Sequence, residues 1–225
     1  MHQHTTANSR RGIRGRVTRL YLKCSFLNFY FFKISTFLNP IKMITTEKTI
    51  TSKWTVDPAH SEIQFKVKHL MISTVTGYFT HFNLEVETEG EDFTRATHIL
   101  FTADIDSINT NNSQRDTHLK SADFFDAATH AQLKFVGRKF EKAGDDYLLH
   151  GDLTIRSTTR PVTVSFDYGG TVVDPYGQTK AGFTIDGKIS RKEFGLTWSA
   201  VTEAGSVVVS DEIRLHAEVQ LVKGA

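Results

Sequence analysis

Apolar and polar residues alternate along much of the chain after residue 50. In residues 61–69, Ile63, Phe65 and Val67 fall on one face, whereas Glu62 and Lys66 fall on the other. Strict alternation of this kind is typical of a strand with one buried face. The same period recurs in residues 75–86, 99–105, 133–135, 149–155, 162–168, 183–189 and 213–221. The pattern therefore predicts about eight strands.

Turn-forming residues separate these segments, at 89–92, 143–146, 169–170 and 174–177. Within 75–86 the apolar face switches between Phe79 and Phe82, which predicts a bulge or a bend. Short helical segments are expected within 115–125, with Ser113 as the N-cap, and at 191–194.

An all-β fold of eight antiparallel strands with hairpin turns predicts a closed barrel or a sandwich. A closed barrel of that size is filled by side chains or holds one small ligand. The inward Gly151 and Gly187 either leave room for a ligand or relieve crowding.

The composition changes near residue 42. Eight of the 27 lysines and arginines lie in residues 1–42, which contain no acidic residue, so the remainder of the chain is net acidic. An acidic domain argues against nucleic-acid binding. Residues 1–42 are therefore interpreted as a disordered or spurious extension and residues 43–225 as one domain.

The extension contains an apolar stretch, residues 20–38, that is interrupted by Lys23 and Lys33. A membrane span needs about 20 nearly uncharged residues, so no stable span is expected. The stretch also lacks the unbroken core and cleavage site of a signal peptide, and a weak targeting signal or an interfacial anchor is the alternative. If Met43 is the true start the protein is expected to be cytoplasmic, and the alternative is the periplasm. Cys24, the single cysteine, also lies here, so the domain forms no internal disulfide.

A polar, loop-like segment between strand patterns contains most of the candidate chemistry. It contains Arg115, Asp116 and His118, followed by Phe124 and Phe125. Loops on rigid sheets are where binding groups tend to lie. Arg115 and Asp116 are expected either to contact a ligand or to hold the loop that does. Phe124 and Phe125 are expected to pack against the barrel end and to contact the ligand, because an exposed pair would form an apolar patch.

Two catalytic interpretations are weighed against the binding one. Ser61, His60, His118 and Asp116 are the residue types of a nucleophile, base and orienting acid. A nucleophile elbow, Gly-x-Ser-x-Gly, is absent, and adjacent His and Ser side chains point apart on a strand. No pair of the domain's eight histidines has the spacing of a structural zinc site. We therefore expect no catalytic residue and no metal ligand. A hydrolase acting on a lipid-like substrate and a ligand-free interaction module remain the alternatives.

Several motifs in the domain resemble the YceI-like family of bacterial lipid-binding proteins, over roughly residues 52–222. The resemblance rests on motifs at Trp54, Asp57, His60 and Ser61; His69; Gly77 and Phe79; Ser107, Ile108 and Thr110; Arg115, Asp116, His118 and Leu119; Phe124 and Phe125; Gly151–Ile155; and Arg191, Phe194 and Gly195. One departure is the run Thr129, His130 and Ala131, where family members commonly have Tyr-Pro.

The resemblance implies an extended, lipocalin-like barrel that binds a polyisoprenoid or another long amphiphilic lipid without catalysis. It also implies a homodimer, and a bound lipid or quinone rather than another cofactor. Inward aromatic side chains would line the tunnel, with candidates Phe65, Phe79, Phe82, Phe101, Phe135, Phe166 and Phe183. Head-group contacts are expected from Arg115, Asp116, His118 and His60 near the mouth, since Arg and His are donors to phosphate or quinone oxygens.

Overall fold

Antiparallel strands make up most of the chain in the computed structural model, which describes residues 51–143, 146–201 and 208–224. The strands are β1 (Thr51–Val56), β2 (Glu62–His69), β3 (Ser73–Phe79), β4 (Phe82–Glu89), β5 (Asp92–Asp104), β6 (Ile108–Asn109), β7 (Gln132–Ala143), β8 (Asp146–Ile155), β9 (Thr158–Val173), β10 (Thr179–Ser190) and β11 (Val209–Lys223). The helices are α1 (Ser113–Lys120) and three short 3₁₀ helices, η1 (Pro58–His60), η2 (Ile105–Ser107) and η3 (Lys192–Phe194). The predictions for residues 1–42 lie outside the described residues.

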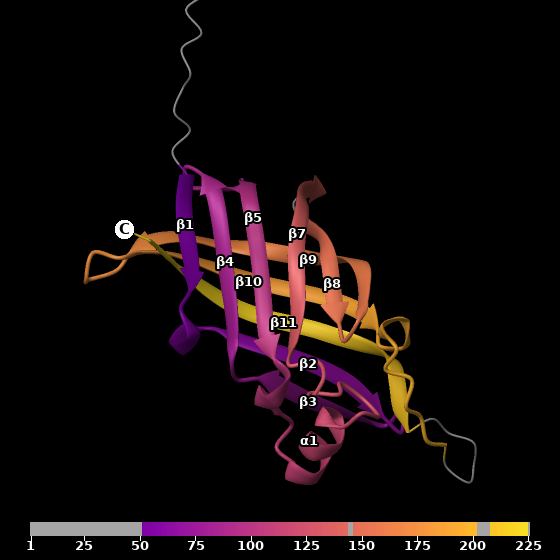
Figure 1. Cartoon of the computed structure of the whole chain (residues 1–225). Coiled ribbons are helices and arrows are strands. Elements are labelled where there is room, and N and C mark those ends of the chain that lie inside the picture. The colour runs from indigo at the N-terminus through magenta and orange to yellow at the C-terminus, as the bar shows by residue number, and fades with distance from the viewer. Residues whose placement is uncertain (1–50, 144–145, 202–207, 225) are drawn as a thin grey trace, which may run out of the picture. The chain divides into compact units, whose positions relative to one another are not determined.

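Eight of the strands close into a barrel, in the order β1-β4-β5-β7-β8-β9-β10-β11 (Figure 1). The ring closes because β1 pairs with two strands, so that Trp54 lies opposite Val86 of β4 and opposite Lys223 of β11. Every pairing in the ring is antiparallel. The prediction of an eight-stranded antiparallel barrel is confirmed.

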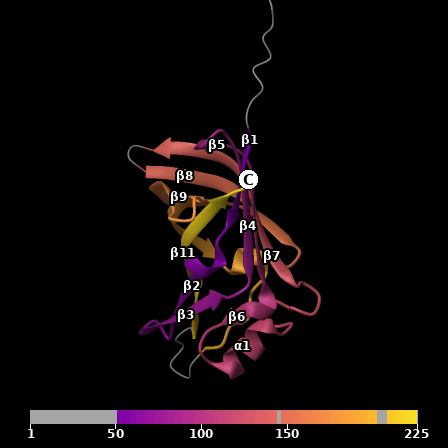
Figure 2. The same cartoon turned by 90° about the vertical axis from the view of Figure 1, so that its left-hand side faces the viewer.

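The remaining strands extend the barrel wall from the other half of β11. Because β11 is long, its last residues pair with β1 while its earlier residues pair with β2, with Leu215 opposite Phe65. β3 continues from β2, and the short β6 pairs with β3 through Phe79 and Ile108. Figure 2 shows β2, β3 and β6 in the lower part of the barrel with α1 beside β6.

Three details differ from the predictions. Residues 75–86 form two strands rather than one bent strand, because the chain turns at Thr80, whose N–H and hydroxyl both donate to the Ser107 carbonyl. β1 and β6 were not predicted, since β1 is short and its inward residues include the polar Ser52, and β6 spans two residues. The N-cap of α1 is Asn112 rather than Ser113: its Oδ1 accepts the Arg115 N–H at 2.9 Å.

Candidate ligand-binding cavity

An apolar cavity of about 260 Å³ runs inside the barrel. Its lining includes Val56 and Phe93 near one end and Val67 and Leu196 near the other. Along β11 alone the lining extends from Val209 to Leu221, which corresponds to roughly 40 Å of extended strand. Within the described chain, the polar residues on this lining are Gln64, Arg191 and His216. The cavity is therefore long, narrow and almost wholly apolar.

All seven phenylalanines that the strand pattern predicted to face inward line the cavity. They are Phe65, Phe79, Phe82, Phe101, Phe135, Phe166 and Phe183. Several of their rings contact one another, with centroids 5.7 Å apart for Phe65 and Phe79 and 6.2 Å apart for Phe166 and Phe183. Their inward direction follows from strand parity, and a direct contact with a ligand stays a prediction.

Two further phenylalanines of the cavity were not predicted from the sequence. Phe140 has the opposite parity to Phe135, yet both line the cavity, because a bulge between Gly137 and Lys139 shifts the register by one residue. Phe93 lies next to the β4–β5 turn, where the alternation of apolar and polar residues is lost. The centroid of its ring is 4.8 Å from that of Trp54 and 4.8 Å from that of Phe183. The glycine at 137 was the available signal for the first of these.

Inward glycines leave space for side chains of neighbouring strands. A Cβ atom at Gly151 would lie 2.3 Å from the ring of Phe135, and one at Gly77 would lie 2.2 Å from the ring of Phe65. A Cβ atom at Gly187 would lie 2.7 Å from Cγ1 of Val164. These glycines therefore relieve crowding, and the alternative that they leave open space for a ligand is not supported.

The cap, residues 112–130, covers the end of the cavity beside β3 and β6. Leu119, Phe124 and Phe125 of the cap line the cavity. The Phe125 ring lies edge-on to Phe79 with centroids 6.5 Å apart, while the buried Phe124 packs 5.3 Å from Trp198. The predicted packing is confirmed for Phe125, which contacts β3, whereas Phe124 packs against Trp198 at the same end of the cavity.

Arg115 and Asp116 bind the cap to the barrel through one buried residue, Thr110. Asp116 Oδ1 accepts hydrogen bonds from the N–H and the hydroxyl of Thr110, at 2.9 and 2.5 Å. Arg115 donates from Nε to the Thr110 hydroxyl and from a terminal nitrogen to its carbonyl, both at 2.7 Å. Neither side chain lines the cavity. The geometry favours the loop-holding role over direct contact with a ligand.

His118 lies on the outer side of the cap. Its Nε2 is 3.2 Å from Asp123 Oδ2, and its ring packs edge-on to Phe124 and Trp198, 5.0 and 5.1 Å away between centroids. It does not line the cavity but supports Phe124, which does.

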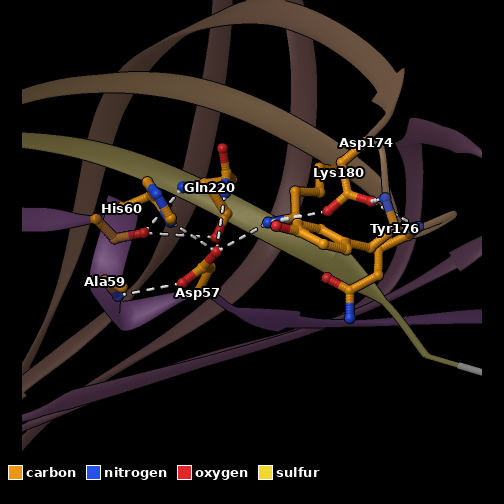
Figure 3. A network of polar contacts seen from close by, with 9 residues as sticks. Asp57, Ala59, His60, Asp174, Tyr176, Lys180 and Gln220 are labelled. Carbon is orange, nitrogen blue, oxygen red and sulfur yellow. Dashed lines mark hydrogen bonds and ion pairs between the residues drawn. The ribbon is translucent and has the colours of Figure 1, made fainter.

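His60 belongs to a different network, at the junction of β1, β10 and β11 (Figure 3). Its Nδ1 lies 2.9 Å from Asp57 Oδ2, which also accepts from the Gln220 amide at 2.9 Å and from Lys180 Nζ at 3.3 Å. Burial, which raises an acid's pKa, is outweighed by these hydrogen bonds and one from the Ala59 N–H, and the pKa of Asp57 falls to about 2. The expected convergence of His60 with His118 is therefore not seen: each histidine binds its own carboxylate.

Ser61 is held by the backbone of β11. Its hydroxyl accepts the Gln220 N–H at 2.9 Å and donates to the Gln220 carbonyl at 3.4 Å, while the adjacent His60 ring turns to Asp57. The hydroxyl is thus not hydrogen-bonded to the histidine that was weighed as its general base.

Arg191 is a buried charged side chain on the cavity lining. Its Nε donates to the Ser210 carbonyl at 2.9 Å and its terminal nitrogens donate to the carbonyls of Leu196, Trp198 and Val209. Burial lowers the pKa of Arg191, and the charge of nearby Asp211 opposes that shift. These bonds fix the segment that places Trp198 against the cap. Arg191 belongs to a motif visible in the sequence, but the motif did not predict its place in the cavity wall.

In residues 51–143, 146–201 and 208–224, no three His, Cys, Asp or Glu side chains are grouped to hold a metal ion. No helix in the same residues is long and apolar enough to cross a membrane.

Comparison with known proteins identifies the family of this chain. Residues 54–221 match the YceI-like domain. A UPF0312 protein of Staphylococcus epidermidis is 33% identical over 172 residues, covering 75% of this chain and 96% of that protein. The crystal structure of a Campylobacter jejuni YCEI protein is 30% identical, with a TM-score of 0.60 over 71% of this chain and 91% of that one.

A third relative shares the fold at low identity. It is a polyisoprenoid binding domain from Saccharophagus degradans, 13% identical, with a TM-score of 0.54 over 76% of this chain and 98% of that one. The match over the described barrel, together with the 33% identical relative, makes the chain a member of the YceI-like domain family.

Proposed function

We propose that the barrel binds a long-chain isoprenoid or a similar amphiphilic lipid, without catalysis, for transport or storage. The observation that supports this most directly is the cavity itself, which follows β11 from Val209 to Leu221 and is lined by aromatic and aliphatic side chains. A long, narrow, apolar space matches a chain-like ligand better than a compact one. The polyisoprenoid-binding name of the Saccharophagus degradans domain, which has the same fold, agrees with this ligand class.

Hydrocarbon burial supplies the binding energy in this proposal. Each buried CH₂ group contributes roughly 0.8 kcal/mol, from which the costs of ordering and association are subtracted. The cavity volume of about 260 Å³ lies just below the roughly 300–1,000 Å³ of most ligand sites. A long tail therefore requires lining rings to turn, and in this proposal the turning rings are the partly buried Phe82 and Phe101.

The head group is proposed to lie at the cap end of the cavity. Arg191 lines the wall there, and its four hydrogen bonds to backbone carbonyls leave one N–H and the guanidinium charge for an oxygen of a phosphate or quinone. In this proposal Arg115 and Asp116 act on the ligand through Thr110 and the cap rather than by contact, and His118 acts through Phe124. His60 lies in the Asp57 network and would have no head-group role.

Native mass spectrometry and solvent extraction of the purified full chain test the proposal. We expect a bound lipid whose extracted mass equals the difference between the native and the denatured protein. An empty barrel after expression, and again after incubation with isoprenoid lipids, would favour a ligand-free interaction module. Turnover of a lipid ester that is lost in Ser61→Ala would favour the hydrolase alternative.

A homodimer, which the sequence resemblance implied, is part of the same proposal. Light scattering at micromolar concentration checks it, and a strict monomer counts against it.

A further inference from the structure

The loop between β2 and β3 has a backbone that its residues do not favour. Leu70 and Met71 both have left-handed backbones, with φ of 50° and 61°, in a three-residue loop between the register partners His69 and Ser73. The Ile72 N–H donates to the His69 carbonyl at 3.2 Å, so Leu70 and Met71 are the two central residues of a tight turn. Turns with two central residues at positive φ prefer Asn-Gly, because β-carbons crowd the backbone there. Strain of this kind persists where the surrounding structure enforces it, often at binding sites. We call Leu70, Met71 and Ile72 the tip.

The tip exposes large apolar side chains. Met71 is 62% exposed and Ile72 is 84% exposed. The Leu70 N–H donates to the Val208 carbonyl at 2.8 Å, and the Val208 N–H donates to the Ala200 carbonyl at 3.0 Å. The tip is therefore fixed to its neighbours by backbone hydrogen bonds, so it projects these side chains from a defined position.

The tip lies at one end of the cavity. Val67 and Val209 line the cavity, and Val209 is the register partner of His69, the residue before the tip. In Figure 1, β2 and β3 run together to the lower right, to the beginning of β11. Apolar groups on the outside thus adjoin the end of an apolar space inside.

The hairpin that carries the tip is basic. The two strands contain Lys66 and Lys68 and a single acidic residue, Glu62, which lies at the end of β2 farthest from the tip. In the described part of the chain, neither lysine forms an ion pair, and the nearby carboxylate of Glu212 is paired with Lys188 and Arg214. Two cations beside protruding apolar side chains match an anionic lipid surface, where headgroups attract the lysines and the apolar tip enters the acyl boundary.

We propose that the tip docks the barrel onto an anionic bilayer, at the end of the cavity through which a lipid exchanges with the membrane. The purpose of docking rests on the proposed lipid-binding function, whereas the docking surface rests on the tip. A convex hairpin with two protruding side chains favours a fluid bilayer over a flat protein partner, because the bilayer deforms around it.

Vesicle sedimentation of the full chain tests the docking. The variant Met71→Asn with Ile72→Thr removes the apolar groups and keeps the fold, since Asn tolerates positive φ and Thr is β-branched like Ile. We expect this variant to bind vesicles of equal parts phosphatidylcholine and phosphatidylglycerol about tenfold more weakly than the native chain. Native binding is expected to fall on pure phosphatidylcholine, and equal binding there would overturn the role of Lys66 and Lys68.

A matched control removes similar apolar groups from β9, level with the far end of β11. Val172 and Val173 are 64% and 63% exposed, and Val172 pairs with Lys180, the partner of Val222. Val222 lies roughly 40 Å along the strand from Val209. Val172→Thr with Val173→Thr is expected to sediment like the native chain. A loss of binding as large as that of the tip variant would overturn the proposal.

Loading from detergent-solubilised isoprenoid separates docking from lipid binding. Unchanged loading of the tip variant with weakened sedimentation supports docking. Loading of the native chain without any sedimentation overturns docking and leaves the proposed function standing. Sedimentation of the native chain without loading overturns the proposed lipid binding and leaves docking standing. A native dimer that becomes a monomer in the tip variant, with no sedimentation of either, identifies the tip as a protein interface and overturns the proposal.

Discussion

Asp116 holds Thr110 through one carboxylate oxygen, which accepts both the N–H and the hydroxyl of that buried residue. In Asp116→Ala these two donors lose their acceptor inside the cap, so we expect the free energy of unfolding to fall by about 1–3 kcal/mol. The lipid masses extracted from the folded variant should be unchanged, because Asp116 does not line the cavity. Urea unfolding and lipid extraction measure the two effects.

The control for this variant is Asp106→Ala, which removes an exposed carboxylate before the cap. It should alter unfolding by less than about 0.5 kcal/mol. If Asp116→Ala stays as stable as the native chain but loses its lipid, the carboxylate contacts the ligand and the structural role is wrong.

Thr88 is the hydrogen-bond partner of the buried Trp54. The Trp54 indole N–H donates to the Thr88 hydroxyl at 3.1 Å, and that hydroxyl donates to the Gly90 carbonyl at 2.7 Å. Thr88→Val keeps the shape but leaves the indole N–H without an acceptor, which should lower the free energy of unfolding by about 1–3 kcal/mol. The exposed Thr97→Val is the control and should be nearly neutral. Equal midpoints for both variants in thermal unfolding would contradict the prediction.

Asp57 makes the barrel sensitive to acid. Its pKa falls from 3.8 to about 2 in the folded protein, and its side chain is 15% exposed. A lowered pKa stabilises the fold above the unfolded-state value, and this contribution disappears as the pH falls from about 4 to about 2. The shift corresponds to about 2 kcal/mol. Urea unfolding at neutral and acidic pH should show a smaller loss in Asp57→Asn than in the native chain.

Asp167→Asn, which alters an exposed carboxylate on β9, is the control for this pH series. It should keep the native pH dependence. If Asp57→Asn also kept it, the Asp57 network in Figure 3 would not contribute to acid unfolding.

Strand parity predicted the barrel well because burial on one face is a local property of each strand. The alternation of Ile63, Phe65 and Val67 survives in the cavity lining. The same rule failed at Phe140, where one extra residue in β7 reverses the parity. It also gave no sign that β1, rather than β2, completes the ring of eight, because closure depends on which half of β11 each strand meets.

The polar residues were predicted less well because their partners are distant in sequence. Asp57 and Gln220 are joined by one hydrogen bond although they stand at opposite ends of the domain. The residue type and the loop position of His60 suggested a mouth group, but only the fold shows which end of the barrel it occupies. For Arg191 the motif could be recognised in the sequence, but its hydrogen-bond partners could not be predicted. They are four backbone carbonyls, on β11 and on the segment before it.

Ala217 offers a direct test of whether the cavity is the binding site. It lines the cavity from the middle of β11, so Ala217→Phe should block the channel there. We expect the long-chain lipid to be lost, or replaced by shorter chains, in native mass spectra. Overpacking should also lower the free energy of unfolding by about 1–3 kcal/mol. Glu218→Phe places the same ring on the exposed face of the next residue and should keep the lipid. If Ala217→Phe is folded and still binds the native lipid, the ligand does not occupy this part of the barrel.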